Sequence, residues 1–504
     1  MLLLALSFVC VPAVASEQIP DSATLRQLAA AAYGPIPSNF RQVIEFNGTL
    51  SGREVTYRLA SDSRVVRDVG PIHNESGSYR GERWHQTANG HTVVDLPDPG
   101  LATGETFNVT VQRVSAPVDA YLVSTLNVRG DGTLEYFDPT THYLIRRETV
   151  AGNGKTATEY DDFKPFGARN LAGHWHVRDD TAKTDIDYYV REFASNVVSD
   201  VDVARPASRR QLVEFPARVD GVRLPARFTR DGHVIVRITV GERGLDFLLD
   251  TGSSAVTIDP GTARSLGITV FNRESSSMNA GRYDTGEAIL PEVKVGDLTL
   301  PDVVVSVLPF GWQVDGETKA VGLLGFDFLC EMGVTIDYQH QTVTAERFGT
   351  YQAPDDPQTI RLAIRLGTQQ PVTSATINGA IAERTVLDTG AAGALQIFDY
   401  FARRHPEALV EDAGLGARSR VPHVFTGAGG LYLAKPYAIE DLQLGQASFH
   451  DFIGFRAMSR SSFPVNEDGL IGVSFLRLFD VYLDYPNDKV YLVPNKTAKK
   501  AVQE

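Results

Sequence analysis

From about residue 41 to residue 203, apolar and polar residues alternate in short segments, and clusters of turn-forming residues separate these segments. The clearest segments and turns are residues 43–46, 56–59, 89–90, 130–132, 143–147 and 152–154. Alternation with a period of two places apolar side chains on one face of a strand, and Gly with Asn or Asp favours hairpin turns. The pattern therefore predicts an antiparallel β domain over residues 20–204.

A short helix is predicted at the start of this domain, over residues 20–32. Leu25, Leu28 and Ala29 fall on one helical face, and Asp21 or Ser22 stands where a capping side chain is expected.

Further along the chain, two apolar runs end in an acidic residue. Residues 247–253 read Phe-Leu-Leu-Asp-Thr-Gly-Ser, and residues 385–391 read Thr-Val-Leu-Asp-Thr-Gly-Ala. Each apolar run predicts a buried strand. Asp250 and Asp388 then lie at strand ends, where a carboxylate is costly to bury unless it is hydrogen-bonded or paired.

The surroundings of Asp250 and Asp388 match each other in further blocks that keep the same order. The matching pairs are Gly241 with Gly379, residues 293–298 with 442–447, residues 322–329 with 469–476, and residues 334–338 with 481–485. Self-similarity of this kind indicates a duplicated unit. We name residues 211–348 lobe 1 and residues 358–495 lobe 2.

The lobe boundaries are set by a polar basic stretch at residues 205–210 and by a proline-containing stretch at residues 353–357. From this division we expect the lobes to fold without the N-terminal domain. The extra length of lobe 2 falls where Leu395, Phe398 and Phe401 predict an additional helix.

With these motifs in place, each lobe resembles a retropepsin-like (clan AA) aspartic protease unit of the bacterial type, over roughly residues 225–495. That family has the apolar-apolar-Asp-Thr-Gly-Ser/Ala loop and a downstream apolar-apolar-Gly segment next to it. Two segments fit the second element: Leu323, Leu324, Gly325 in lobe 1 and Leu470, Ile471, Gly472 in lobe 2. The resemblance implies a mainly β chain, with a bilobal acid-protease-like region and a few short helices after the N-terminal domain.

The implied activity is hydrolysis of peptide bonds by an aspartic endopeptidase. Two carboxylates held close together share one proton, so one activates water while the other polarises the substrate carbonyl. Asp250 and Asp388 would form this dyad within one molecule, so a monomer suffices and a peptide or protein is the implied substrate. No cofactor is implied.

The remaining loop residues would support the dyad. By resemblance, Thr251 and Thr389 brace the two loops, and Gly252 and Gly390 allow tight turns beside the carboxylates. The last residue of the motif differs between the lobes, as Ser253 and Ala391. We expect the Ser253 hydroxyl to donate to Asp250, which would favour the shared proton on Asp388.

A hairpin that covers the substrate is also expected. The candidates are residues 275–290 in lobe 1 and the glycine-rich residues 425–432 in lobe 2; the sequence does not choose between them, or exclude that both are plain hairpins. A third Asp-Thr-Gly, at residues 284–286, has no apolar run before it, and we interpret it as a turn in the first hairpin.

Two other functions stay open. The chain could be a catalytically silent peptide-binding protein that keeps the protease fold. It could also be an envelope- or lipid-handling protein, because residues 136–163 resemble the half-barrels of periplasmic lipoprotein carriers.

Composition limits the partners and the location. The formal net charge of −14 argues against a nucleic-acid surface. Residues 1–15 have the apolar run and small-residue end of a signal peptide, which predicts export to the periplasm or the extracellular space. Elsewhere no stretch has the roughly 20 apolar residues of a membrane span. His174 and His176 share a strand face without a convincing third ligand, so no metal site is predicted.

Overall fold

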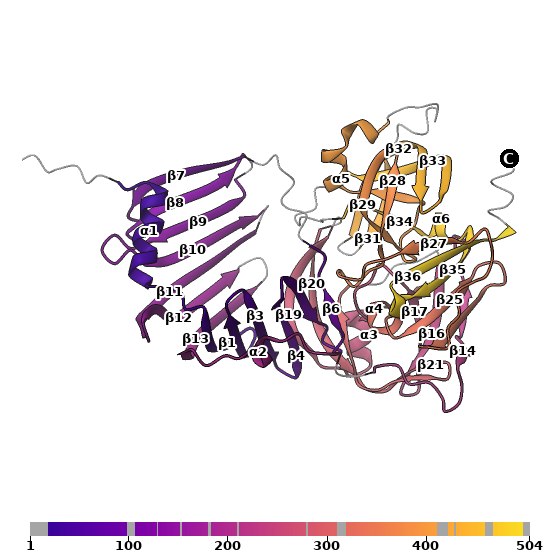
Figure 1. Cartoon of the computed structure of the whole chain (residues 1–504), viewed down its shortest axis with the longest axis horizontal. Coiled ribbons are helices and arrows are strands. Elements are labelled where there is room, and N and C mark those ends of the chain that lie inside the picture. The colour runs from indigo at the N-terminus through magenta and orange to yellow at the C-terminus, as the bar shows by residue number, and fades with distance from the viewer. Residues whose placement is uncertain are drawn as a thin grey trace, which may run out of the picture. The chain divides into compact units, whose positions relative to one another are not determined.

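The structure is a computed structural model. It describes residues 19–97, 106–128, 130–151, 154–179, 183–208, 211–278, 281–309, 319–410, 422–427, 430–458 and 467–496. The predicted signal peptide, residues 1–15, lies outside this part of the chain. The fold is mainly β with a few short helices, as predicted (Figure 1). No helix of the described residues is long and apolar enough to cross a membrane.

The chain divides into two compact units, and the smaller one contains residues up to 36 together with residues 105–172. Its sheet has the strand order β11-β10-β9-β8-β7. The elements are α1 (Ser22–Tyr33), β7 (Phe107–Val114), β8 (Ala120–Asn127), β9 (Gly132–Phe137), β10 (Leu144–Ala151) and β11 (Gly154–Phe166). Helix α1 starts at the predicted cap, because the Thr24 amide donates to Asp21 Oδ1 at 2.7 Å, and it packs Leu25 and Ala29 against the sheet.

The larger unit contains residues 37–104 and 173–504, and its first sheet has the order β6-β5-β4-β3-β2-β1-β13-β12. The strands are β1 (Asn39–Gly48), β2 (Gly52–Leu59), β3 (Asp62–Val69), β4 (Ile72–Tyr79), β5 (Glu82–Gln86), β6 (Thr92–Val94), β12 (Arg169–Asp179) and β13 (Thr184–Ser195). Strand β12 begins before the division between the units. Neighbouring strands in this sheet pair antiparallel, and the short helix α2 (Asp200–Val203) follows it.

Lobe 1 is built on a ten-stranded sheet. Nine strands follow the order β19-β20-β23-β18-β24-β17-β16-β21-β22, and the tenth, β15, pairs with β16. Its elements are β15 (Ala226–Phe228), β16 (Val234–Val240), β17 (Arg243–Leu249), β18 (Thr257–Ile258), α3 (Pro260–Ser265), β19 (Val270–Met278), β20 (Gly281–Leu290), β21 (Val293–Val295), β22 (Leu298–Leu300), β23 (Val303–Val307), β24 (Gly322–Leu324) and α4 (Phe326–Leu329).

Lobe 2 is built on a seven-stranded sheet with the order β28-β29-β34-β30-β33-β32-β31. Its elements are β28 (Val372–Ile377), β29 (Ala380–Leu387), β30 (Leu395–Ile397), α5 (Asp399–Arg404), η1 (Pro406–Ala408), β31 (His423–Gly427), β32 (Gly430–Leu444), β33 (Ala447–Ala457), β34 (Gly469–Ile471) and α6 (Val473–Leu476).

A third sheet contains strands from both lobes, in the order β14-β26-β25-β35-β36-β27. Its elements are β14 (Gly221–Arg223), β25 (Met332–Asp337), β26 (Thr342–Arg347), β27 (Ile360–Ala363), β35 (Phe479–Asp484) and β36 (Lys489–Pro494), with η3 (Tyr485–Asn487) between the last two. The lobes meet where β25 pairs antiparallel with β35, and this pairing includes Val334 opposite Leu483. One backbone ladder therefore joins the ends of the two repeats.

The matching sequence blocks adopt matching structures. In lobe 1, β17 runs parallel to β24, and in lobe 2, β29 runs parallel to β34. The predicted additional helix corresponds to α5, which buries Phe401. It is not additional, however, because lobe 1 has helix α3 after its own equivalent strand, β18.

The third Asp-Thr-Gly lies within strand β20, where Asp284 pairs with Ser275, and not in a turn as predicted. Residues of the triplet continue the alternation of side chains that runs to Leu290, so they belong to the strand.

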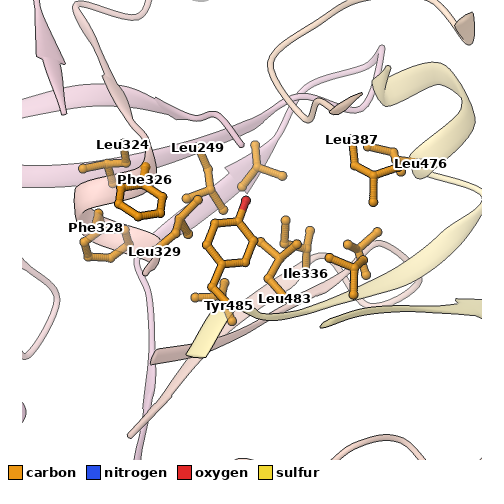
Figure 2. Packing of buried hydrophobic residues seen from close by; sticks show 14 of the residues in the cluster. Leu249, Leu324, Phe326, Phe328, Leu329, Ile336, Leu387, Leu476, Leu483 and Tyr485 are labelled. Atoms are coloured by element: carbon orange, nitrogen blue, oxygen red, sulfur yellow. The ribbon is translucent and has the colours of Figure 1, made fainter. Parts of the chain in front are cut away.

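The principal apolar core extends over both lobes, and Tyr485 lies inside it (Figure 2). Figure 2 shows its ring surrounded by Leu249, Leu329, Ile336 and Leu483. The Tyr485 hydroxyl has no hydrogen-bond partner among the described residues. A buried hydroxyl without a partner loses its hydration and gains nothing in exchange.

We predict that Tyr485→Phe raises the free energy of unfolding by about 1 kcal/mol, because it removes that unpaired group and keeps the ring. Chemical denaturation measures the change. Tyr485→Leu is the control for shape, and it should lower the free energy of unfolding because it leaves a cavity. A loss of stability in Tyr485→Phe would show that the hydroxyl is hydrogen-bonded in solution.

Candidate active site

The two acidic loops are anchored by the apolar-apolar-Gly segments. Asp250 follows β17 and its amide donates to Leu324 O at 3.0 Å, while Asp388 follows β29 and its amide donates to Ile471 O at 2.9 Å. The equivalent bond in each lobe fixes the backbone at the position where the carboxylate begins.

Two threonine hydroxyls link the loops reciprocally. Thr251 Oγ1 donates to Leu387 O at 2.7 Å, and Thr389 Oγ1 donates to Leu249 O at 2.8 Å. The same hydroxyls accept from the opposite backbone: the Thr251 amide donates to Thr389 Oγ1 at 3.1 Å, and the Thr389 amide donates to Thr251 Oγ1 at 2.9 Å. Both threonines are buried, so breaking one bond would leave a polar group without water.

The loop glycines leave room for the carboxylates. A Cβ atom on Gly252 would lie 2.4 Å from Asp388 Cγ, and a Cβ atom on Gly390 would lie 2.4 Å from Asp250 Cγ. Each carboxylate therefore lies over the glycine of the other loop, which brings Asp250 and Asp388 into one site.

The glycines of the supporting segments have a similar role. A Cβ atom on Gly325 would lie 2.4 Å from Ser253 O, and one on Gly472 would lie 2.6 Å from Gly393 O. Leu323, Leu324, Leu470 and Ile471 belong to strands β24 and β34, which line these loops from the core side.

The two carboxyl groups are electrostatically unequal. Burial raises the pKa of Asp250 well above its usual range, and the neighbouring Asp388 charge raises it further. Burial also raises the pKa of Asp388, but this rise is opposed by the amides of Gly390 and Ala391, which donate to Asp388 Oδ1 at 2.8 and 2.9 Å. Two carboxyl groups buried this close together favour sharing a single proton.

The structure contradicts the hydrogen bond expected from the Ser253 hydroxyl to Asp250. Its hydroxyl donates to Ala255 O at 2.8 Å instead of to the Asp250 carboxylate, which receives the Gly252 amide at 2.9 Å. The turn that follows Ser253 offers a backbone carbonyl at close range, and the hydroxyl pairs with that. In lobe 2, the backbone amide of Ala391 supplies the hydrogen bond for which no side chain is available.

The candidate covering hairpins lie in different surroundings. The lobe 1 hairpin, β19–β20, contacts the N-terminal sheet, where Asn272 Nδ2 donates to Val69 O at 3.4 Å. In the lobe 2 hairpin, β31–β32, Phe425 stacks on Tyr432. Burial raises the pKa of Tyr432, and the Asp388 charge adds to the rise, so this tyrosine lies within electrostatic reach of the dyad.

Sequence reasoning missed two glutamines at the site. Gln370 Nε2 donates to Gly252 O, and Gln369 Nε2 donates to Ser254 O at 3.0 Å, so a turn of lobe 2 holds the Asp250 loop of lobe 1. These glutamines belong to no recognisable motif. Only their position just before strand β28 could have drawn attention to them.

The described residues contain no cluster of three or more His, Cys, Asp or Glu side chains suited to a metal ion. His174 and His176 both lie at hydrogen-bond distance from Asp187 Oδ1, at 3.0 and 2.9 Å. Residues two apart on a strand share a face, and this brings both rings to the one carboxylate.

Comparison with known proteins finds a family match over part of lobe 1. A profile of the family described as aspartyl protease matches residues 236–328, which include the Asp250 loop and the Gly325 segment. A search of curated proteins found no match. Among solved structures, the chain is similar to an aspartic proteinase from Irpex lacteus, with 14% identity over 55% of this chain and 98% of that one, and a TM-score of 0.34.

We predict that Ser253→Ala leaves both limbs of the pH profile of kcat/KM in place, because the hydroxyl does not bond the dyad. The measurement is peptide hydrolysis from acidic to neutral pH. A downward or upward move of either limb by about half a pH unit would show that the hydroxyl stabilises one charge state of Asp250.

Stability should also depend on pH through the dyad. A carboxyl with a raised folded-state pKa keeps its proton after the unfolded chain has lost it, so stability falls as pH rises above about 4, the usual value for Asp. The fall ends at the folded-state pKa and amounts to about 1.4 kcal/mol for each unit between the two values. Denaturation of wild type and Asp250→Asn from pH 4 to 8 should show the smaller fall in the variant, which lacks one titrating group; equal slopes would contradict the assignment.

Proposed function

We propose that the protein is an aspartic endopeptidase whose dyad, Asp250 and Asp388, forms between duplicated lobes of one chain. The observation that carries this proposal is the pair of interlocked Asp-Thr-Gly loops, in which each carboxylate lies over the glycine of the other loop. The aspartyl protease profile over residues 236–328 supports the same activity.

The carboxylates have complementary roles in this mechanism. The ionised Asp388 accepts a proton from a water molecule, whose oxygen attacks the scissile carbonyl carbon. The protonated Asp250 donates to the carbonyl oxygen as negative charge develops there. A proton then moves to the amide nitrogen, the C–N bond breaks, and the dyad again holds one proton.

The loop contacts provide the preorganisation that this chemistry needs. The threonine bonds hold the two loops at fixed separation, and the amides of Gly390 and Ala391 stabilise the Asp388 charge. Positioned groups of this kind replace the solvent reorganisation that would otherwise accompany proton transfer.

Substrate and location follow from the same proposal. The substrate is a peptide or protein, and the aromatic pair Phe425 and Tyr432 supplies an apolar wall for its side chains. Because one chain carries both carboxylates, a monomer suffices. With the leader predicted at residues 1–15, the proposed enzyme acts after export, and its proposed type is that of the bacterial retropepsin-like proteases.

We predict that Asp250→Asn and Asp388→Asn each reduce kcat by at least about 1,000-fold, because neither variant can share one proton between two carboxyl groups. Digestion of a peptide library by purified protein, followed by mass spectrometry, identifies cleavage. Asp284→Asn is the matched control, since it changes the third Asp-Thr-Gly at an exposed strand position, and it should keep wild-type activity.

Three outcomes would contradict the assignment. Substantial cleavage by either dyad variant would remove that residue from the mechanism. A folded wild type that binds peptides without cleaving them would favour a silent binding protein, and lipid co-purifying with it would favour the lipid-handling alternative.

A further inference from the structure

A segment of the N-terminal sheet contacts both lobes near the catalytic loops. It consists of β5, the following turn, β6 and the chain to Pro97, and we name residues 82–97 the arm. Val93 of the arm belongs to the principal apolar core of the lobes. The expected boundary near residue 205 therefore does not coincide with a break in packing.

The arm is joined to lobe 1 by buried hydrogen bonds. The Asn89 side chain pairs with the backbone of Val304 like another strand residue, since Nδ2 donates to Val304 O and Oδ1 accepts from Val304 N, both at 2.8 Å. Thr87 Oγ1 and Asn89 Nδ2 also donate to Asp327, at 3.1 and 2.9 Å. Asp327 lies in α4, directly after the Gly325 segment that supports the Asp250 loop.

The arm also contacts lobe 2. A Cβ atom on Gly367 would lie 2.4 Å from Leu96 N, so the two backbones touch there. Arg384 of β29 donates to Pro97 O. His85 Nε2 lies 3.2 Å from Gln369 Oε1, and Gln369 in turn donates to Ser254 O in lobe 1.

The last of these contacts defines the charge of His85. Ser254 O can only accept, so the amide nitrogen of Gln369 faces it and the amide oxygen faces His85. The other ring nitrogen, His85 Nδ1, lies 2.6 Å from Asp95 Oδ1. Both ring nitrogens therefore face acceptors, and the two bonds form together only when the imidazole carries two protons.

The groups around His85 are compatible with a positively charged ring. Asp95 provides the counter-charge, and Arg83 Nε approaches Asp95 Oδ2 at 3.8 Å. The neighbours of His85 across the sheet are Ser76 on β4 and Val93 on β6, which are uncharged. From lobe 2 the facing group is the neutral amide of Gln369.

We propose that the arm is a positioning element of the active site, in which protonated His85 holds Gln369 against Ser254 and so fixes the Asp250 loop relative to lobe 2. This rests on the proposed proteolytic function. Deprotonation removes one hydrogen from the ring, so either the Asp95 bond or the Gln369 bond is lost. The connection is therefore complete only while the ring carries both protons.

The test compares His85→Ala, Gln369→Ala and the double variant with wild type. Each single variant should lower kcat about tenfold or more at acidic pH with little change in KM, because a shifted catalytic loop misplaces the reacting groups without removing substrate contacts. The double variant should be no worse than the more severe single variant, since both break one connection. The ratio of wild-type to His85→Ala activity should approach one at the alkaline end.

The matched control is His174→Ala, which removes a histidine whose ring bonds Asp187 inside the N-terminal sheet. It should keep wild-type kcat at every pH. If His85→Ala behaves like this control, or lowers activity by the same factor at all pH values, the proposed role of His85 is wrong.

Amide hydrogen exchange of residues 250–255 provides a readout that needs no activity. Gln369→Ala should accelerate exchange in this loop at acidic pH and change it less at alkaline pH. Faster exchange with no detectable proteolysis by wild type would support the arm and reject the proposed function. Unchanged exchange in an active enzyme would support the function and reject the arm.

Discussion

Two buried carboxyl groups in one small site are the constraint on which the rest of this structure depends. Neither burial nor mutual repulsion favours two charges there, so the fold must hold the groups together against that cost. The Thr251 and Thr389 hydroxyls hold the loops together by donating to backbone carbonyls of the opposite loop. Glycines occupy the positions where any side chain would collide with a carboxylate. The site thus consists of two loops that cannot be placed independently.

Near-symmetry creates this pairing, and small departures from it give the two carboxyl groups different hydrogen-bond partners. Both loops have the same strand before them and the same glycine segment behind them. The difference lies in the amides: Asp388 Oδ1 accepts from Gly390 and Ala391, whereas the Ser253 amide bonds the Asp250 backbone carbonyl at 3.2 Å. The two loops therefore differ in the backbone course after each aspartate as well as in the serine or alanine side chain.

The contacts outside the loops show how lobe spacing is maintained. Strands β25 and β35 join the lobes at one sheet, and the arm joins them again through Asn89 on one side and Pro97 on the other. A site that spans two lobes loses its geometry if either connection shifts, which gives the N-terminal sheet a physical reason to contact the lobes.

The sequence by itself indicated most of the strands, two similar acidic loops and the glycine segments behind them. Apolar periodicity and self-similarity are local properties of the chain, so Asp250, Asp388 and both glycine segments can be named from the order of residues alone. Only the tertiary structure decided that Ser253 turns to Ala255 and that Asp284 sits within a strand. Only it brought His85 to Gln369 and Asn89 to Val304, because such contacts join residues far apart in the chain through single hydrogen bonds, which leave no periodic trace in the sequence.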